Sequence, residues 1–243
     1  MRTTTKTLLG LAALAAGVAT SMAQNVYSLN IVGYANVSAP PGQYAFHVPP
    51  FQVTTAVTNG LNEILPANTG QFDGDQVFIF TGTAFGSVYL DSSKPTGFSD
   101  SGGTQVGAPI VNMGQSYVYL NNQGPSAYTN LTYVGQVRTG TNTINIPVTP
   151  TYHAIGSPTP FAGGLKTVLQ FANPGTYDGD AAQILSGGKF GAVFFDSTSS
   201  TGFSNSGGTP VPEPQIAVGQ GFIFDNEVGP LSPPITWSQV FNP

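Results

Sequence analysis

The chain has 243 residues, a length for one or two domains, and only 7% of them are charged, against about 25% in an ordinary globular protein. Six Lys and Arg residues cannot build a basic surface for phosphates, so we exclude nucleic acid as a partner. The absence of Cys excludes disulfides, thiolate zinc sites and cysteine nucleophiles, while 40% apolar residues suffice for a hydrophobic core.

The first segment has the features of a secretory signal peptide. Arg2 and Lys6 give it a positive start, and the apolar run at 8–19 is too short to span a bilayer. A small-x-small cleavage pattern ends at Ala23, so we predict a signal peptide at 1–23 and a secreted protein. Its location is then the periplasm, the cell surface or the extracellular space. The alternative is a retained membrane anchor, and no later segment predicts a membrane span.

The rest of the chain contains an internal repeat. Residues 73–125 recur as 178–230 without a gap, with 25 identities in 53 positions. The sequence predicts a duplication, with β-repeat 1 at 24–137 and β-repeat 2 at 138–243. The boundary crosses an apolar, strand-like run, so we expect two lobes that pack together.

Outside this stretch the alignment of the repeats needs gaps. GQYAFHVP at 42–49 resembles GTNTINIP at 140–147, which implies seven extra residues in the second copy before Asp178. Both segments alternate polar and apolar residues, as a half-buried strand does.

Short strands dominate the prediction in chain order. The strand-like runs are rich in β-branched and aromatic residues and lie between Gly, Asn, Asp and Ser clusters; they are 44–48, 77–80, 87–90, 116–120, 143–148, 184–185, 192–195 and 221–224. Helical spacing occurs only at 61–65 and 165–169. We predict an all-β fold of two tandem homologous β-sandwich or barrel-like units, each with at most one short helix.

A similar edge motif occurs at 30–37, at 131–137 and at 235–241. We expect the middle copy to be shared between the two units and the two terminal strands to meet, within one chain or between chains. Neither terminal strand carries a charge that would protect its edge. Self-association by strand addition is therefore a predicted mode of partnership.

The opening NVYSLNIVGY at 25–34, with GDQVFIF at 74–80 and VGQGFIF at 218–224, resembles a group of uncharacterised secreted β-repeat proteins of Verrucomicrobia and related bacteria. The resemblance covers nearly all of the predicted mature chain. It implies a secreted β-repeat protein, but these motifs are structural, so no activity and no functional residue carries over.

Acidic residues recur with the repeat and are the most suggestive candidate site. Carboxylates and loop carbonyls could bind calcium, which prefers oxygen ligands, with Asp73, Asp75, Asp178 and Asp180 as the candidate ligands. The other interpretation is that these residues hold turns, because Asp-Gly is a turn dipeptide and Asp caps its own loop backbone. The same choice applies to the remaining members of the set, Asp91, Asp100, Asp196 and Asn205. We favour the turn role and expect no cofactor, with calcium as the alternative.

Few other residues offer chemistry. Paired carboxylates can hydrolyse glycosides, but a duplicated pair is more typical of structure than of one active site. His47 and His153 do not match in the repeat, since Asn145 aligns with His47, so we expect strand-face or loop roles for them. Trp237 is the only indole platform for a sugar, and the Tyr and Phe residues fall in runs where core packing is expected.

The sequence therefore predicts an exported, non-enzymatic structural or interaction protein of the cell surface or extracellular matrix, one that can self-assemble through its terminal strands. The alternative is a carbohydrate- or calcium-binding module, with a surface glycan as partner. Exposed aromatic side chains in a groove would favour the sugar, and carboxylates that converge on one ion would favour calcium.

Overall fold

The structure is a computed structural model, in which the chain from Val32 onward forms one compact unit. It describes residues 31–53, 58–65, 70–123, 128–147, 149, 151–171, 173, 175, 177–226 and 234–242. The predicted signal peptide lies outside these residues. In the part of the chain that is described, no helix has the length and apolar character needed to cross a membrane.

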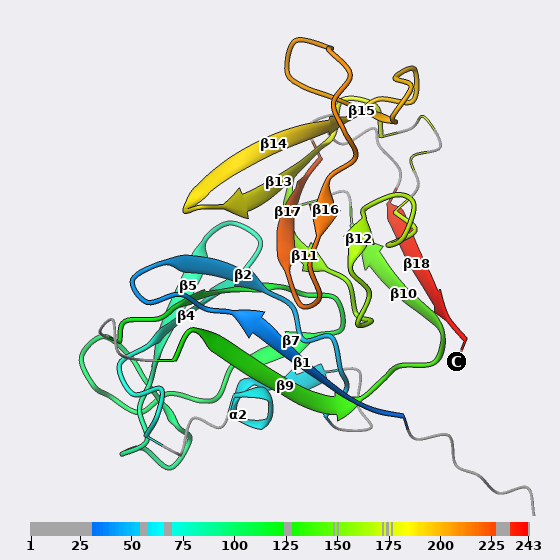
Figure 1. Cartoon of the computed structure of the whole chain (residues 1–243). Coiled ribbons are helices and arrows are strands. Elements are labelled where there is room, and N and C mark those ends of the chain that lie inside the picture. The colour runs from blue at the N-terminus through cyan, green and yellow to red at the C-terminus, as the bar shows by residue number, and fades with distance from the viewer. Residues whose placement is uncertain are drawn as a thin grey trace, which may run out of the picture. The chain divides into compact units, whose positions relative to one another are not determined.

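The described residues are nearly all strands and turns, which confirms the all-β prediction (Figure 1). The first half contains β1 (Val32–Ser38), β2 (Tyr44–His47), β3 (Thr58–Gly60), α2 (Leu61–Ile64), β4 (Gln76–Phe80), β5 (Phe85–Leu90), β6 (Phe98–Ser99), β7 (Ile110–Asn112), β8 (Tyr117–Leu120) and β9 (Asn130–Gln136). The second half contains β10 (Gly140–Ile146), β11 (Tyr152–Gly156), β12 (Gly163–Gly164), β13 (Ala181–Ser186), β14 (Lys189–Phe195), β15 (Phe203–Ser204), β16 (Gln215–Ile216), β17 (Gly221–Asp225) and β18 (Ile235–Phe241).

Each half has an open, antiparallel five-stranded sheet. The order is β2-β8-β4-β5-β6 in the first half and β11-β17-β13-β14-β15 in the second. Val77 lies opposite Tyr119, and Ala182 lies opposite Phe224, so equivalent pairs stand 105 residues apart. In each half the first and last strands pair to form a two-stranded ribbon, β1 with β9 in the first half and β10 with β18 in the second. A second small ribbon is formed by β3 and β7 in the first half and by β12 and β16 in the second.

The alignment of 42–49 with 140–147 is wrong. His47 of β2 lies opposite Tyr117, and Ile155 of β11 lies opposite Phe222, so β11 is the equivalent of β2 at a spacing of 108 residues. The second half is therefore shorter than the first before Asp178, not longer by seven residues. Segment 140–146 is β10, which occupies the place of β1. Alternation of polar and apolar residues marks a strand but does not tell one strand from another.

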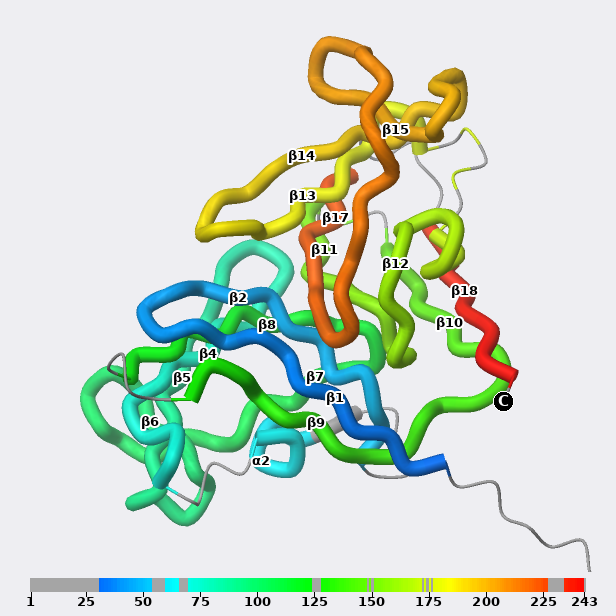
Figure 2. Tube along the Cα trace, in the orientation of Figure 1, coloured from blue at the N-terminus to red at the C-terminus, as the bar shows by residue number. Residues whose placement is uncertain are grey.

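The expected meeting of the two terminal strands within one chain is also wrong, whereas a meeting between chains stays a prediction. β1 pairs with β9 along its whole length, from Val32 opposite Gln136 to Ser38 opposite Asn130. β18 pairs with β10 in the same way, so β9 is not shared between the halves. Figure 2 shows these as two separate ribbons. The motifs at 131–137 and 235–241 look alike because β9 and β18 are equivalent strands that each close their own half.

Each half packs its own apolar core against the inner face of its sheet. In the first half Val77, Tyr117 and Leu131 belong to one buried cluster, and in the second half Phe222 and Trp237 belong to another. Leu61 and Ile64 of α2 are buried in the first core, as the helical spacing predicts. Residues 165–168, by contrast, form a turn, although Leu165 and Leu169 are buried.

The outer faces of the two sheets meet in a third apolar cluster. Phe46 and Val118 from the first half pack with Ala154 from the second, and further apolar side chains of β4, β13 and β17 lie against them. This contact explains why 77–80 and 117–119 are apolar at successive positions, since both faces of these strands are covered.

The backbones of the two halves also exchange hydrogen bonds in a reciprocal way. The Val48 amide donates to the Gly219 carbonyl at 2.9 Å, and the Gly156 amide donates to the Gly114 carbonyl at 2.9 Å. Val48 and Gly156 are equivalent, as are Gly114 and Gly219, so the exchange follows a pseudo-two-fold relation.

Candidate functional site

The candidate calcium ligands Asp73 and Asp178 each bind a serine that follows the second sheet strand after them, β5 or β14. The Asp73 carboxylate accepts hydrogen bonds from the Ser92 amide at 2.7 Å and from its hydroxyl at 2.6 Å. Asp178 accepts the same pair from Ser197, at 2.7 and 2.5 Å, and a third from the Asn173 amide group at 2.6 Å. Both carboxylates therefore connect two loops.

Asp91, Asp100, Asp196 and Asn205 of the same set cap the turns that follow them. The pKa of Asp91 is lowered, chiefly by a hydrogen bond from the Ser93 hydroxyl, and the pKa of Asp196 is lowered in the same way by Thr198. Asp100 accepts the amides of Gly102 and Thr104 at 2.9 and 2.8 Å. Asn205 accepts the equivalent amides of Gly207 and Thr209, both at 3.0 Å, with a side-chain oxygen that needs no charge.

Asp75 differs from these residues because it is fully buried. Its carboxylate accepts a hydrogen bond from the Tyr119 hydroxyl and another, at 2.8 Å, from the Asn122 amide. Burial raises the pKa of Asp75, and these hydrogen bonds oppose that effect. The group therefore ties the start of β4 to the end of β8. Asp180 is equally buried, with Phe224 in the place of Tyr119.

Calcium binding by Asp73, Asp75, Asp178 and Asp180 stays a prediction. Within the described ranges, no group of three or more His, Cys, Asp or Glu side chains is arranged so that it could hold a metal ion. The hydrogen bonds above give Asp73 and Asp178 the loop-holding role that the Asp-Gly pattern also predicts.

Replacing Asp178 by alanine should lower the free energy of unfolding by about 1 kcal/mol, the usual effect of losing a capping side chain. Asp178→Asn keeps an oxygen that can accept from Ser197 and should lose less. Urea denaturation measures both effects. Added calcium should leave the melting temperature of the unaltered protein unchanged; a rise of several degrees that Asp178→Asn abolishes would instead establish a metal site.

A cluster of buried polar aromatic residues in the first half was not expected from the sequence. His47 is fully buried, and its ring stacks on Tyr117 with the centroids 5.9 Å apart. The rings of Tyr119 and Tyr133 also contact His47, and the hydroxyls of Tyr117 and Tyr133 are 2.6 Å apart. Neither His47 nitrogen has a hydrogen-bond partner among the described residues. Burial lowers the pKa of His47 to about 3, so the ring is neutral.

In the second half the residues equivalent to His47, Tyr117 and Tyr119 are apolar. Ile155 occupies the place of His47, which corrects the alignment of His47 with Asn145. Phe222 and Phe224 replace Tyr117 and Tyr119. The sequence could have indicated the His47 cluster through a comparison of equivalent positions in the two halves, once β11 is matched with β2.

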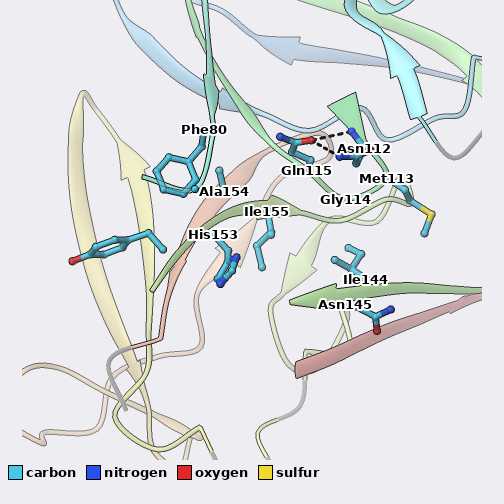
Figure 3. A pocket seen from close by; sticks show the side chains of 12 residues that line it. Phe80, Asn112, Met113, Gly114, Gln115, Ile144, Asn145, His153, Ala154 and Ile155 are labelled. Atoms are coloured by element: carbon cyan, nitrogen blue, oxygen red, sulfur yellow. Dashed lines mark hydrogen bonds between the residues drawn. The ribbon is translucent and has the colours of Figure 1, made fainter. Parts of the chain in front are cut away.

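Two clefts lie between the halves and are related by the same pseudo-two-fold relation. Cleft A has a volume of about 490 Å³ and includes Tyr44, Asn36 and Gln220 in its lining. Cleft B has a volume of about 260 Å³ and is lined at equivalent positions by Tyr152, Asn145 and Gln115. Figure 3 shows cleft B, with Gln115 hydrogen-bonded to Asn112 on one side and His153 and Asn145 from the second half on the other.

The aromatic residues of these clefts are not the ones that the sequence singled out. Trp237 is buried in the second core and donates its indole N–H to the Leu169 carbonyl at 2.7 Å, so it is not a surface platform. Tyr44 and Tyr152, the first residues of β2 and β11, are instead 51% and 47% exposed.

Comparison with known proteins finds no family, no curated protein and no solved structure that matches the chain.

Proposed function

We propose that the protein is an exported, non-enzymatic structural or interaction protein of the cell surface or extracellular matrix. The observation that carries this proposal is the use of the repeated acids. Both carboxylate oxygens of Asp73 accept hydrogen bonds from Ser92, and those of Asp178 accept the equivalent hydrogen bonds from Ser197, so the geometry is the same in both halves. Side chains committed to loop structure in duplicate support a binding or structural role over acid–base catalysis.

Composition supports the same proposal. The segment at 1–23 has the pattern of an export signal, and a chain without Cys needs no oxidising or reducing environment to fold. A surface with few charges and many Asn, Gln, Ser and Thr residues offers hydrogen bonds to neutral partners.

Self-association by strand addition belongs to this proposal in a revised form. β18 is protected at Val240, whose amide donates to the Gln170 side chain at 3.1 Å. β1 has β9 as its one strand neighbour among the described residues, and Val32 and Tyr34 on it are exposed. β1 is therefore the strand that we propose for pairing with a second copy, and light scattering over a range of concentrations measures it.

The proposal predicts export, cleavage and no turnover. Expressed with its own first segment in a Gram-negative host, the protein should leave the cytoplasm and start at Gln24, which intact-mass measurement detects. Incubated with neutral hexasaccharides, the purified protein should release no shorter product by mass spectrometry. An unprocessed cytoplasmic chain would contradict the export part. Product release that Asp73→Asn or Asp178→Asn abolishes, without loss of folding, would make the protein a hydrolase.

A further inference from the structure

We propose that cleft A is a binding site for a neutral oligosaccharide and that cleft B is its pseudo-symmetric second site. The inference rests on the proposed function, since it names the ligand class of that interaction protein. It is carried by the lining of the two clefts and by their equivalence.

The chemistry of cleft A fits a ligand rich in hydroxyl groups. Amides of Asn36, Asn130, Gln43 and Gln220 line it, together with the hydroxyl of Ser186. Amide and hydroxyl groups both donate and accept hydrogen bonds, as sugar hydroxyls do. No Lys, Arg, Asp or Glu is among the described residues that line the cleft, so an anionic or cationic ligand would find no counter-charge.

Tyr44 supplies the apolar surface that a sugar ring needs. Its ring packs on Phe78, with the centroids 5.8 Å apart and the planes tilted by 59°, and about half of the side chain stays exposed at the cleft. A tyrosine held in this way offers an apolar face and a polar hydroxyl at little conformational cost. This is the exposed aromatic residue in a groove that distinguishes a carbohydrate site from a calcium site.

The clefts are built into the fold. Their walls come from both halves, which are held together by the reciprocal backbone hydrogen bonds of Val48 and Gly156. In cleft A the Gln220 side chain accepts the Ala217 amide at 2.9 Å, and in cleft B Gln115 accepts the equivalent Asn112 amide at 3.0 Å. A wall fixed by its own hydrogen bonds is preorganised for a ligand. The volume of cleft A lies within the usual range of ligand pockets, about 300–1,000 Å³.

Calorimetric titration of the mature chain with five neutral hexasaccharides tests the proposal: cello-, xylo-, chito-, laminari- and maltohexaose. We expect at least one of them to bind with a dissociation constant below 1 mM. Tyr44→Ala should weaken that binding at least tenfold, and Tyr44→Phe, which keeps the ring, should weaken it less than threefold. Tyr152→Ala should remove only the binding at cleft B. Ile110→Ala, at a residue that is 61% exposed and outside both clefts, is the control and should bind normally.

Three results would overturn the inference: no binding by any of the five sugars, binding that is unchanged in Tyr44→Ala, or binding only of polygalacturonate or of an extended Val-Thr heptapeptide. Circular dichroism and melting of each variant separate a lost site from a lost fold. Failure of these titrations leaves the export and turnover measurements untouched, so the ligand class and the proposed function fail separately.

Discussion

Replacing Gly156 by valine should lower the free energy of unfolding by about 3 kcal/mol, which is at the upper end for overpacking. A Cβ at Gly156 would lie 2.6 Å from Val48 Cγ1 and 3.1 Å from the Gln220 carbonyl oxygen. Val48 is fully buried between the halves, and a β-branched side chain has few rotamers with which to move aside. Denaturation in urea measures the loss, and the transition should stay cooperative.

The chain offers a position for a control substitution and another for a compensating one. A Cβ at Gly191 of β14 would have no neighbour within 4 Å among the described residues, so Gly191→Val should change stability by less than about 0.5 kcal/mol. Val48→Gly opens the space that a side chain at position 156 needs, so Gly156→Val should cost at least about 1.5 kcal/mol less in that background than alone. Equal losses of stability with and without Val48→Gly would show that this contact does not limit how closely the two halves approach each other.

The Val48–Gly156 contact also shows one way in which the two halves differ. The two residues are at equivalent positions, one in each half, and they touch each other across the pseudo-two-fold relation. Two copies of the first half would bring Val48 against Val48, where the close approach of the backbones leaves no room. The halves are therefore complementary rather than interchangeable, and each needs the other to cover the outer face of its sheet.

The parts of the structure that the sequence could predict are the local ones. Asp100 with its turn, and Asn205 with the equivalent turn, follow from side chains that bond to backbone amides two and four residues away. The strand runs at 77–80 and 117–120 follow from β-branched and aromatic composition. Such features depend on neighbours in the chain, which the sequence states directly.

The parts that could not be predicted depend on which strand lies beside which. The alternation at 140–147 fits the place of β1 as well as that of β2, and the wrong choice made β9 look like a strand shared by both halves. The same choice matched His47 with Asn145 and hid its true equivalent, Ile155. The clefts were beyond prediction for a related reason, since Tyr44 looks like a core residue until the neighbouring sheet is placed.

Replacing His47 by isoleucine, the residue at the equivalent position 155, should reduce the loss of stability between pH 7 and pH 5 by about 2 kcal/mol. The pKa of His47 is about 3 in the folded protein because the ring is buried, whereas an unfolded histidine titrates near 6.5. The unfolded chain therefore binds the extra proton first, and stability falls as the pH drops below about 6.5. Above pH 7 the ring is neutral in both states and contributes no slope.

At pH 5 the folded His47 ring is still neutral, so its contribution to the loss of stability depends only on the pKa of the histidine in the unfolded chain. One and a half pH units below 6.5 correspond to about 2 kcal/mol. The groups around the ring do not titrate in this range: Tyr117, Tyr119 and Tyr133 have pKa values raised by burial. Asp75, which binds Tyr119, is present in both proteins, so the difference between them isolates His47.

At pH 7 the isoleucine variant should be as stable as the unaltered protein or more stable, by up to about 2 kcal/mol. The two ring nitrogens of His47 have no hydrogen-bond partner within the described residues, so the change removes buried polar atoms without taking a partner from any tyrosine. Tyr117→Phe, which copies Phe222 of the second half, is the matched control: it alters the same cluster but keeps the imidazole, and its loss of stability from pH 7 to pH 5 should equal that of the unaltered protein. Urea denaturation at the two pH values gives all three slopes. If the isoleucine variant keeps the full slope, the proton that unfolds the protein binds elsewhere, and the buried imidazole has no part in its acid response.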